Sequence, residues 1–166
     1  MKKITNKPGN DTEHLRYIRN FFEHRALWLY FLCGEAKKKG FSPDEFAPEA
    51  IKRCGLFHGG LSAAGSPSKS LKNLKKAHFR KAGQNVFEMK ILRCTDTNFD
   101  VDFHYCPLVA AWQKQGCTQE EMEKLCDYAM WGDRGIAESY GARLELPKTI
   151  ARGDGVCQIR FIRDAG

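Results

Sequence analysis

The pair Cys106-Pro107 is the place in this sequence best suited to chemistry. Proline is favoured at the first position of an α-helix, because its missing N–H is not needed there. Cys106 is therefore expected at the cap of a helix running to Gly116, beside unpaired backbone N–H groups and the positive end of the helix dipole. Such surroundings lower the pKa of a cysteine, so Cys106 is predicted to be a reactive, nucleophilic thiol. The alternative is a small core residue that happens to cap a helix, a position where Ser or Asp would serve better.

A histidine precedes this cysteine by two residues on the same face of a predicted strand. His104 could act as a base or as a positive partner for the thiol. The two side chains are roughly 7 Å apart along an extended strand, so a direct hydrogen bond needs a bend at the strand end.

The remaining cysteines suggest neither disulfides nor a zinc ribbon. The chain has seven cysteines at irregular spacing and no C-x-x-C, which is typical of reduced thiols. Cys126 falls in the apolar stripe of a predicted helix, and Cys157 shares a strand face with Ile159 and Phe161, so core burial is the default for both.

A metal site would need His104, Cys106 and a third ligand such as Cys157 or Asp133. The predicted polar and apolar strand faces separate Cys106 from Cys157, so no metal is expected and no cofactor is indicated.

The residues from 11 to 39 predict one long helix, with Asn10, Asp11 or Thr12 as its cap. Its apolar residues form two adjacent stripes, which predicts burial of its second half. Arg25 falls on one stripe and His24 on the other, so both are expected to point toward protein, and Arg25 is a candidate for binding an anion. The first stripe contains Leu15, Ile18, Phe22, Leu29 and Leu32, and the second contains Tyr17, Phe21, Trp28 and Phe31.

Three further segments complete the N-terminal half. Ser42 and Glu45 form a capping box that predicts a helix ending at Gly55, and the stretch 55–68 is rich in small residues and predicts a loop. Segment 68–81 carries six Lys and Arg without an acid, together with Leu71 and Leu74 at helical spacing. A solvated face of an amphipathic helix explains these charges better than a nucleic-acid site, because only one aromatic residue accompanies them.

Segments 85–94 and 99–106 predict two antiparallel strands. Pairing residues whose numbers sum to 192 places Met89 opposite Phe103 and Lys90 opposite Asp102, and a slip by one residue would mix apolar with charged positions. One face is thereby core, and the other carries His104 and Cys106.

The C-terminal part predicts a helix and two more strands. Thr118 and Glu121 form a capping box, Asp133 is a candidate cap for a separate short helix to Tyr140, and two strands flank a Gly-Asp-Gly turn at 153–155. The fold class expected is α+β, with a four-stranded antiparallel sheet and a helical layer that includes the long N-terminal helix.

The 166 residues are expected to form one domain, with a mainly helical half (1–81) and a sheet-containing half (82–166). No apolar run approaches the roughly 20 residues that span a bilayer, and the first residues offer no secretory apolar stretch, so a cytoplasmic protein without membrane contact is expected. The net charge of +7 admits an anionic substrate, while the oligomeric state stays open.

Three motifs, FHYCPLVAAW, GCTQEEMEKLCD and TIARGDGVCQIRF, resemble the C-terminal half of the L-2-amino-thiazoline-4-carboxylic acid hydrolases, over residues 86–163. The family pattern falls on Cys106, Pro107, Cys126, Asp127, Gly153, Asp154 and Cys157. The Gly-Asp-x-x-Cys ending is also similar to that of vinyl-reductase-type small-ligand-binding domains.

The resemblance implies hydrolytic opening of a small cyclic amidine that bears a carboxylate. In this hypothesis Cys106 attacks the amidine carbon, His104 moves protons, and Asp127 or Asp133 orients a partner or activates water. Arg25 would bind the substrate carboxylate. The other candidates for the substrate site are His24, Cys126, Asp154 and Cys157. The alternative is a non-enzymatic domain that binds or senses a small molecule in the same pocket.

Overall fold

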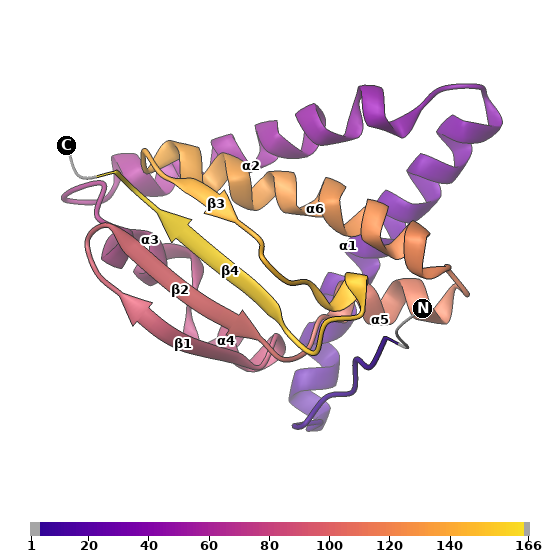
Figure 1. Ribbon diagram of the computed structural model, residues 1–166, viewed down its shortest axis with the longest axis horizontal. Helices are drawn as coiled ribbons and strands as arrows, with labels where there is room; N and C mark the ends of the chain where they lie inside the picture. The colour runs from indigo at the N-terminus through magenta and orange to yellow at the C-terminus, as the bar shows by residue number, and fades with distance from the viewer. Residues whose placement is uncertain (1–3, 165–166) are drawn as a thin grey trace.

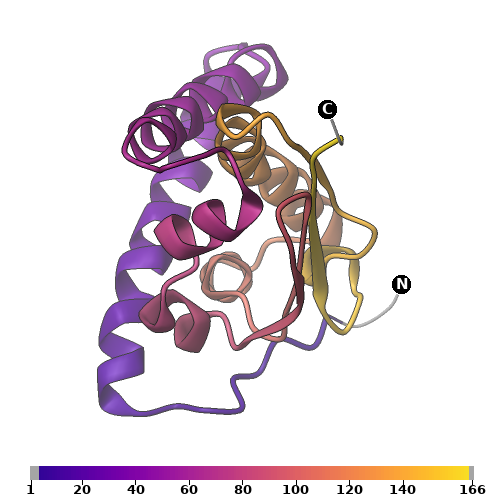
Figure 2. The ribbon, with the colours of Figure 1, turned by 90° about the vertical axis from the view of Figure 1, so that its left-hand side faces the viewer.

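The computed structural model describes residues 4–164 and has the expected α+β architecture. Four antiparallel strands form one sheet in the order β1-β2-β4-β3. The sheet lies at one side of the molecule and α1 at the opposite side, with the other helices packed between and above them (Figures 1 and 2). The elements are α1 (Glu13–Lys38), η1 (Pro43–Glu45), α2 (Ala47–Ala64), α3 (Leu71–His78), α4 (Lys81–Val86), β1 (Met89–Cys94), β2 (Asn98–Phe103), α5 (Pro107–Lys114), α6 (Gln119–Ser139), β3 (Arg143–Glu145), η2 (Ile150–Arg152) and β4 (Cys157–Ile162).

The predicted pairing of the first two strands is confirmed. Met89 pairs with Phe103 and Lys90 with Asp102, and Ile91 pairs with Val101. The register then shifts by one residue after Ile91, at an irregularity of the kind a β-bulge makes, which the side-chain pattern did not predict.

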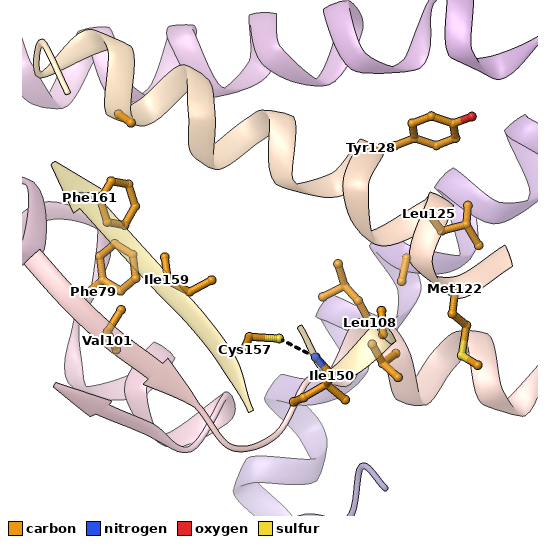
Figure 3. Close-up of a cluster of buried hydrophobic side chains, with 14 of the residues drawn as sticks. Phe79, Val101, Leu108, Met122, Leu125, Tyr128, Ile150, Cys157, Ile159 and Phe161 are labelled. Atoms are coloured by element: carbon orange, nitrogen blue, oxygen red, sulfur yellow. Dashed lines mark hydrogen bonds between the residues drawn. The ribbon is translucent and has the colours of Figure 1, made fainter. Parts of the chain in front are cut away.

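The core forms where the inner face of this sheet meets the helices. Phe79, which follows α3, packs edge-on against Phe99 and Phe161, with ring centroids 4.8 and 5.6 Å apart. These three aromatic side chains are buried, as are Val101 and Ile159 on the neighbouring strand positions (Figure 3). The alternation of apolar residues in β2 and β4 therefore places one face of the sheet in the core.

The prediction that the second helix ends at Gly55 is wrong. Helix α2 continues through the small-residue stretch to Ala64, and two of its glycines, Gly55 and Gly59, lie against α6. A Cβ on Gly55 would lie 2.0 Å from the carbonyl oxygen of Gly132, and one on Gly135 would lie 2.5 Å from that of Lys52. The glycines therefore serve a close approach of two helices, which outweighs their poor helix propensity.

The residues around Asp133 also differ from expectation. The Thr118–Glu121 capping box is confirmed, but α6 runs without interruption to Ser139. Asp133 is therefore a residue of the helix interior and does not cap a separate helix.

The long N-terminal helix is confirmed, with Thr12 as its cap, but the predicted burial of its second half is wrong. Trp28 and Phe31 are exposed, and so are His24 and Arg25, which were expected to point toward protein. Only one face of α1 packs on the domain, mainly against α5.

The arginine of α1 that is buried is Arg19. Its guanidinium donates to the carbonyl oxygens of Val86 (3.1 Å) and Asn10 (2.7 Å) and to Glu88 (3.0 Å), and it stacks on the ring of Tyr105. These contacts fasten the segment before α1 to the start of the sheet.

The glycine contact between α2 and α6 gives a direct test of the fold. We expect Gly55→Ala to destabilise the protein by about 3 kcal/mol or more, because the new methyl group meets backbone that cannot move aside. Gly60→Ala is the matched control in the same helix, where a Cβ meets nothing within 4 Å, and it should stabilise by a few tenths of a kcal/mol or more. Denaturant unfolding measures both, and equal stabilities would contradict the close packing.

Candidate functional site

Cys106 lies where the sequence predicts it, at the N-cap of α5 with Pro107 as the first helical residue. Its backbone is held by Asn6, a residue that no sequence pattern singles out. The Asn6 side chain donates to the carbonyl oxygen of Cys106 (2.8 Å) and accepts from its N–H (2.9 Å). The segment before α1 thus fixes the position of this cysteine from 100 residues away.

The predicted low pKa of this thiol is wrong. The backbone N–H groups of Leu108 and Val109 do lower the pKa of Cys106, although neither makes a capping hydrogen bond to it. Burial raises the pKa more strongly, so the net shift is upward. Cys106 is therefore a protonated thiol at neutral pH in the absence of a ligand.

Three cysteines from separate elements lie close together. A charge on Cys106 raises the pKa of both Cys126, on α6, and Cys157, at the start of β4. The expected separation of Cys106 from Cys157 is therefore wrong. The regular alternation of strand faces ends at Phe103, three residues before Cys106, so it does not decide where Cys106 points. We call Cys106, Cys126 and Cys157 the thiol cluster.

Cys157 is the most constrained member of the thiol cluster. Its sulfur accepts a hydrogen bond from the backbone N–H of Ile150 at 3.2 Å (Figure 3), and burial raises its pKa to about 12. Asp154 closes the same turn by accepting from the N–H of Thr149 (2.9 Å), and Gly153 adopts the left-handed conformation (φ 81°) that favours glycine. In this structure Gly153, Asp154 and Cys157 shape the η2 turn.

A carboxyl group with a pKa near neutrality lies on the same helix as Cys126, seven residues further along. Burial raises the pKa of Asp133 from its ordinary 3.8 to about 6, and the positive charge of Arg25 opposes part of that shift. Arg25 also lowers the pKa of Cys106, so one guanidinium acts on both groups. A partly buried carboxyl that titrates near neutrality is suited to acid–base catalysis.

Two of the expected site residues, His104 and His24, are exposed outside the thiol cluster, and a third, Asp127, lies on the wall of the groove described below. His104 is exposed and is absent from the charged groups that act on Cys106. His24 accepts a hydrogen bond from Trp28 on the outer face of α1 (2.7 Å). Asp127 is exposed and pairs with Arg134 at 3.0 Å.

A groove of about 410 Å³ leads to the thiol cluster, because Cys126 is part of its wall. The groove lies between α6 and the η2 turn. Its basic residues are Lys124, Arg134 and Arg152. Lys124 pairs with Asp44 and Arg134 with Asp127, so their charges are largely neutralised.

Arg152 differs from these two basic residues. It donates to the carbonyl oxygen of Leu146 (2.7 Å) and to Thr149 (3.2 Å), and within residues 4–164 it has no carboxylate partner. Its charge lowers the pKa of Cys126 and Cys157. Arg152 is thus a cation beside the thiols that is free to bind an anion, and its position became evident only from the folded η2 turn.

The part of the chain that the structure describes contains no group of three His, Cys, Asp or Glu side chains arranged to hold a metal ion. Nor does any helix between residues 4 and 164 combine the length and apolarity that crossing a membrane requires.

Together the fold and the site define a small α+β domain in which a helix-capping cysteine lies within a group of partly or fully buried thiols beside a groove. Residues 19–161 match the family described as L-2-amino-thiazoline-4-carboxylic acid hydrolase. The chain belongs to this family.

A comparison with solved structures finds a similar fold in the crystal structure of a trafficking protein particle complex subunit 3 from Naegleria fowleri, covalently bound to palmitic acid. The TM-score is 0.53 and the sequence identity 16%, over 86% of this chain and 95% of the other. At this identity the similarity concerns the fold alone. No curated protein matches the chain significantly.

The raised pKa of Asp133 predicts a pH-dependent stability. Because the folded state holds the proton more tightly than the unfolded chain, this carboxyl costs stability as the pH rises from 3.8 to about 6, and the cost is complete above that range. We expect Asp133→Asn to be more stable than wild type by up to about 3 kcal/mol at pH 7.5. The difference should vanish below pH 3.8.

Thermal or urea unfolding at a series of pH values measures this difference. Asp127→Asn on the same helix is the matched control, because Asp127 is exposed. A pH-independent difference for Asp133→Asn would show that its carboxyl is not perturbed.

Proposed function

We propose that the protein hydrolyses a C–N bond of a small cyclic amidine bearing a carboxylate, with Cys106 as the nucleophile. Membership of the hydrolase family supports the reaction class. Three features carry the assignment: Cys106 at the start of α5, Asp133 with a pKa of about 6, and the charge of Arg25, which acts on both.

The groove supplies the substrate site in this proposal. Arg152 binds the substrate carboxylate, because it is the basic residue of the groove without a carboxylate partner in the described chain. The amidine end then points to the thiol cluster, which Cys126 connects to the groove. A groove of about 410 Å³ falls within the usual size of small-molecule sites.

The chemical steps balance without a cofactor. The sulfur of Cys106 bonds to the amidine carbon while its proton passes to Asp133, and the N–H groups of Leu108 and Val109 favour the sulfur's negative charge. Asp133 returns that proton to the ring nitrogen as the C–N bond breaks. Water then adds to the former amidine carbon, and the bond between this carbon and the Cys106 sulfur breaks. The Cys106 sulfur regains a proton, so that one water is consumed for each ring opened.

Asp133 takes the proton-transfer role in this scheme. His104 was the first candidate for it, but His104 is exposed, whereas Asp133 has the pKa near neutrality that proton transfer requires. Arg25 positions and stabilises the charges that develop on Cys106 and Asp133.

A second candidate function is a binding domain without chemistry. It is favoured by one observation, that burial raises the pKa of all three thiols of the cluster. The turnover measurements below separate the two functions, because a binding domain would retain its ligand affinity without converting the ligand.

Hydrolysis of L-2-amino-thiazoline-4-carboxylate by the purified protein, followed by chromatography of the product, tests the proposal. We expect Cys106→Ala to lose the activity entirely, because no nucleophile replaces the sulfur. Cys54→Ala is the matched control, since Cys54 is exposed on α2, and it should keep full activity. A Cys106→Ala protein with at least a third of wild-type activity would exclude the thiol from the mechanism.

The same assay tests the carboxylate site. We expect Arg152→Gln to raise KM about tenfold or more with a smaller change in kcat, because it removes a charge pair made in the ground state as well as in the transition state. Lys124→Gln, in the same groove but paired with Asp44, should change KM little. An unchanged KM for Arg152→Gln would place the substrate carboxylate elsewhere.

A further inference from the structure

The outer face of α1 is an apolar surface that nothing in the described chain covers. The core side of the helix carries Leu15, Ala26 and Cys33, and four of its aromatic residues lie exposed on the opposite side. Each of the following side chains exposes more than half of its area: Tyr17, Phe21, Trp28, Phe31 and Leu32. Soluble monomers rarely expose a contiguous apolar patch of this kind. We call these five residues the α1 stripe.

We propose that the α1 stripe is a homodimer interface, in which α1 packs antiparallel against the α1 of a second copy. Closed two-fold interfaces require a surface that is complementary to itself. The stripe has this property, because its aromatic residues are almost symmetric about His24. A two-fold axis near His24 places Tyr17 opposite Phe31 of the other copy and Phe21 opposite Trp28.

The charges at the two ends of α1 favour the antiparallel direction. Asp11 and Glu13 lie at its start, and Lys37, Lys38 and Lys39 lie at its end; of these, Asp11 is already paired with Arg16 and Arg19, and Lys38 with Glu35. Antiparallel packing brings the acidic end of each helix to the basic end of the other, and it opposes the two helix dipoles. Parallel packing would instead bring the six lysines of two copies together.

The surface of the stripe has a hollow for an incoming side chain. Trp28, Phe31, Leu32 and Glu35 line a mainly apolar depression of about 280 Å³. Under the symmetry described above, it faces Phe21 and Tyr17 of the second copy. The indole N–H of Trp28 already donates to His24 (2.7 Å), so Trp28 can be covered without losing a hydrogen bond.

The available area is close to what a stable dimer needs. Five large side chains exposed by more than half offer roughly 600 Å² per copy, at the ~150–250 Å² that a large aromatic side chain can bury. Standard interfaces bury ~800 Å² per partner, so the flanking polar residues of α1 need to add only the remainder.

Light scattering coupled to size-exclusion chromatography tests the dimer. The wild type should elute with twice the monomer mass of 18.9 kDa, and the double variant Phe21→Glu/Trp28→Glu should elute as a monomer with an unchanged far-ultraviolet circular dichroism spectrum. Leu92→Glu is the matched control, because Leu92 is an exposed apolar residue on β1, and it should remain dimeric. A monomeric wild type, or a dimeric double variant, would overturn the proposal.

A pair of introduced charges tests the direction of packing. The proposed two-fold axis places Tyr17 of one copy opposite Phe31 of the other, whereas parallel packing would place Tyr17 opposite Tyr17. Tyr17→Lys and Phe31→Glu should each weaken the dimer several-fold in sedimentation equilibrium, and the double variant should recover part of the affinity, since the two introduced side chains carry opposite charges and face each other. Failure of the double variant to recover affinity would overturn the antiparallel arrangement even where a dimer forms.

Discussion

The close contact of α2 with α6 is the constraint on which the site depends. Gly55 and Gly135 allow the two helices to approach until backbone meets backbone, and α6 runs without interruption from Gln119 to Ser139 along this contact. Cys126 and Asp133 lie on that helix seven residues apart, about two turns, so they project from nearly the same face. One face of α6 packs against α2. The opposite face therefore carries Cys126 beside the η2 turn. A wider spacing of the helices would move one thiol of the cluster away from the two that β4 and α5 hold.

Two opposing electrostatic effects act on Cys106. The amides at the start of α5 and the charge of Arg25 favour a thiolate, but the loss of water around the sulfur outweighs them. A helix N-terminus therefore does not by itself produce a reactive cysteine. In the proposed reaction the substrate alters this balance, because a protonated amidine brings a positive charge into the same low-dielectric surroundings. The thiol would then ionise only when substrate is bound, which protects it from adventitious oxidation between turnovers.

The features that the sequence could predict are those fixed by neighbouring residues. The cap at Cys106, the box at Thr118 and the strand register before the shift all follow from local patterns, and the structure confirms them. One local prediction is wrong, because Ser42 makes no side-chain capping hydrogen bond and α2 begins only at Ala47. The other errors concern long-range packing. The glycine-rich stretch that was predicted to be a loop lies inside α2. Gly55 and Gly59 are needed there because α6 leaves no room for a side chain at these positions. Likewise Asn6 gave no signal, since it is 100 residues from the backbone that it holds, and Arg152 became a candidate only when the η2 turn placed it beside the thiols.

The composition of α1 shows why a buried face and an interface are hard to distinguish by pattern alone. Both of its apolar stripes have helical spacing, and only one of them meets the rest of the domain. The polar residues of the helix carry the distinguishing information. Arg19 lies on the core side, where three oxygen atoms and the ring of Tyr105 surround its guanidinium. These partners come from other segments of the chain, so a buried face needs such segments packed against it. The outer stripe has no such partner within the described chain. The α1 stripe is apolar, symmetric along its length and flanked by opposite charges at the two ends of the helix. A second copy of the same helix can therefore cover it.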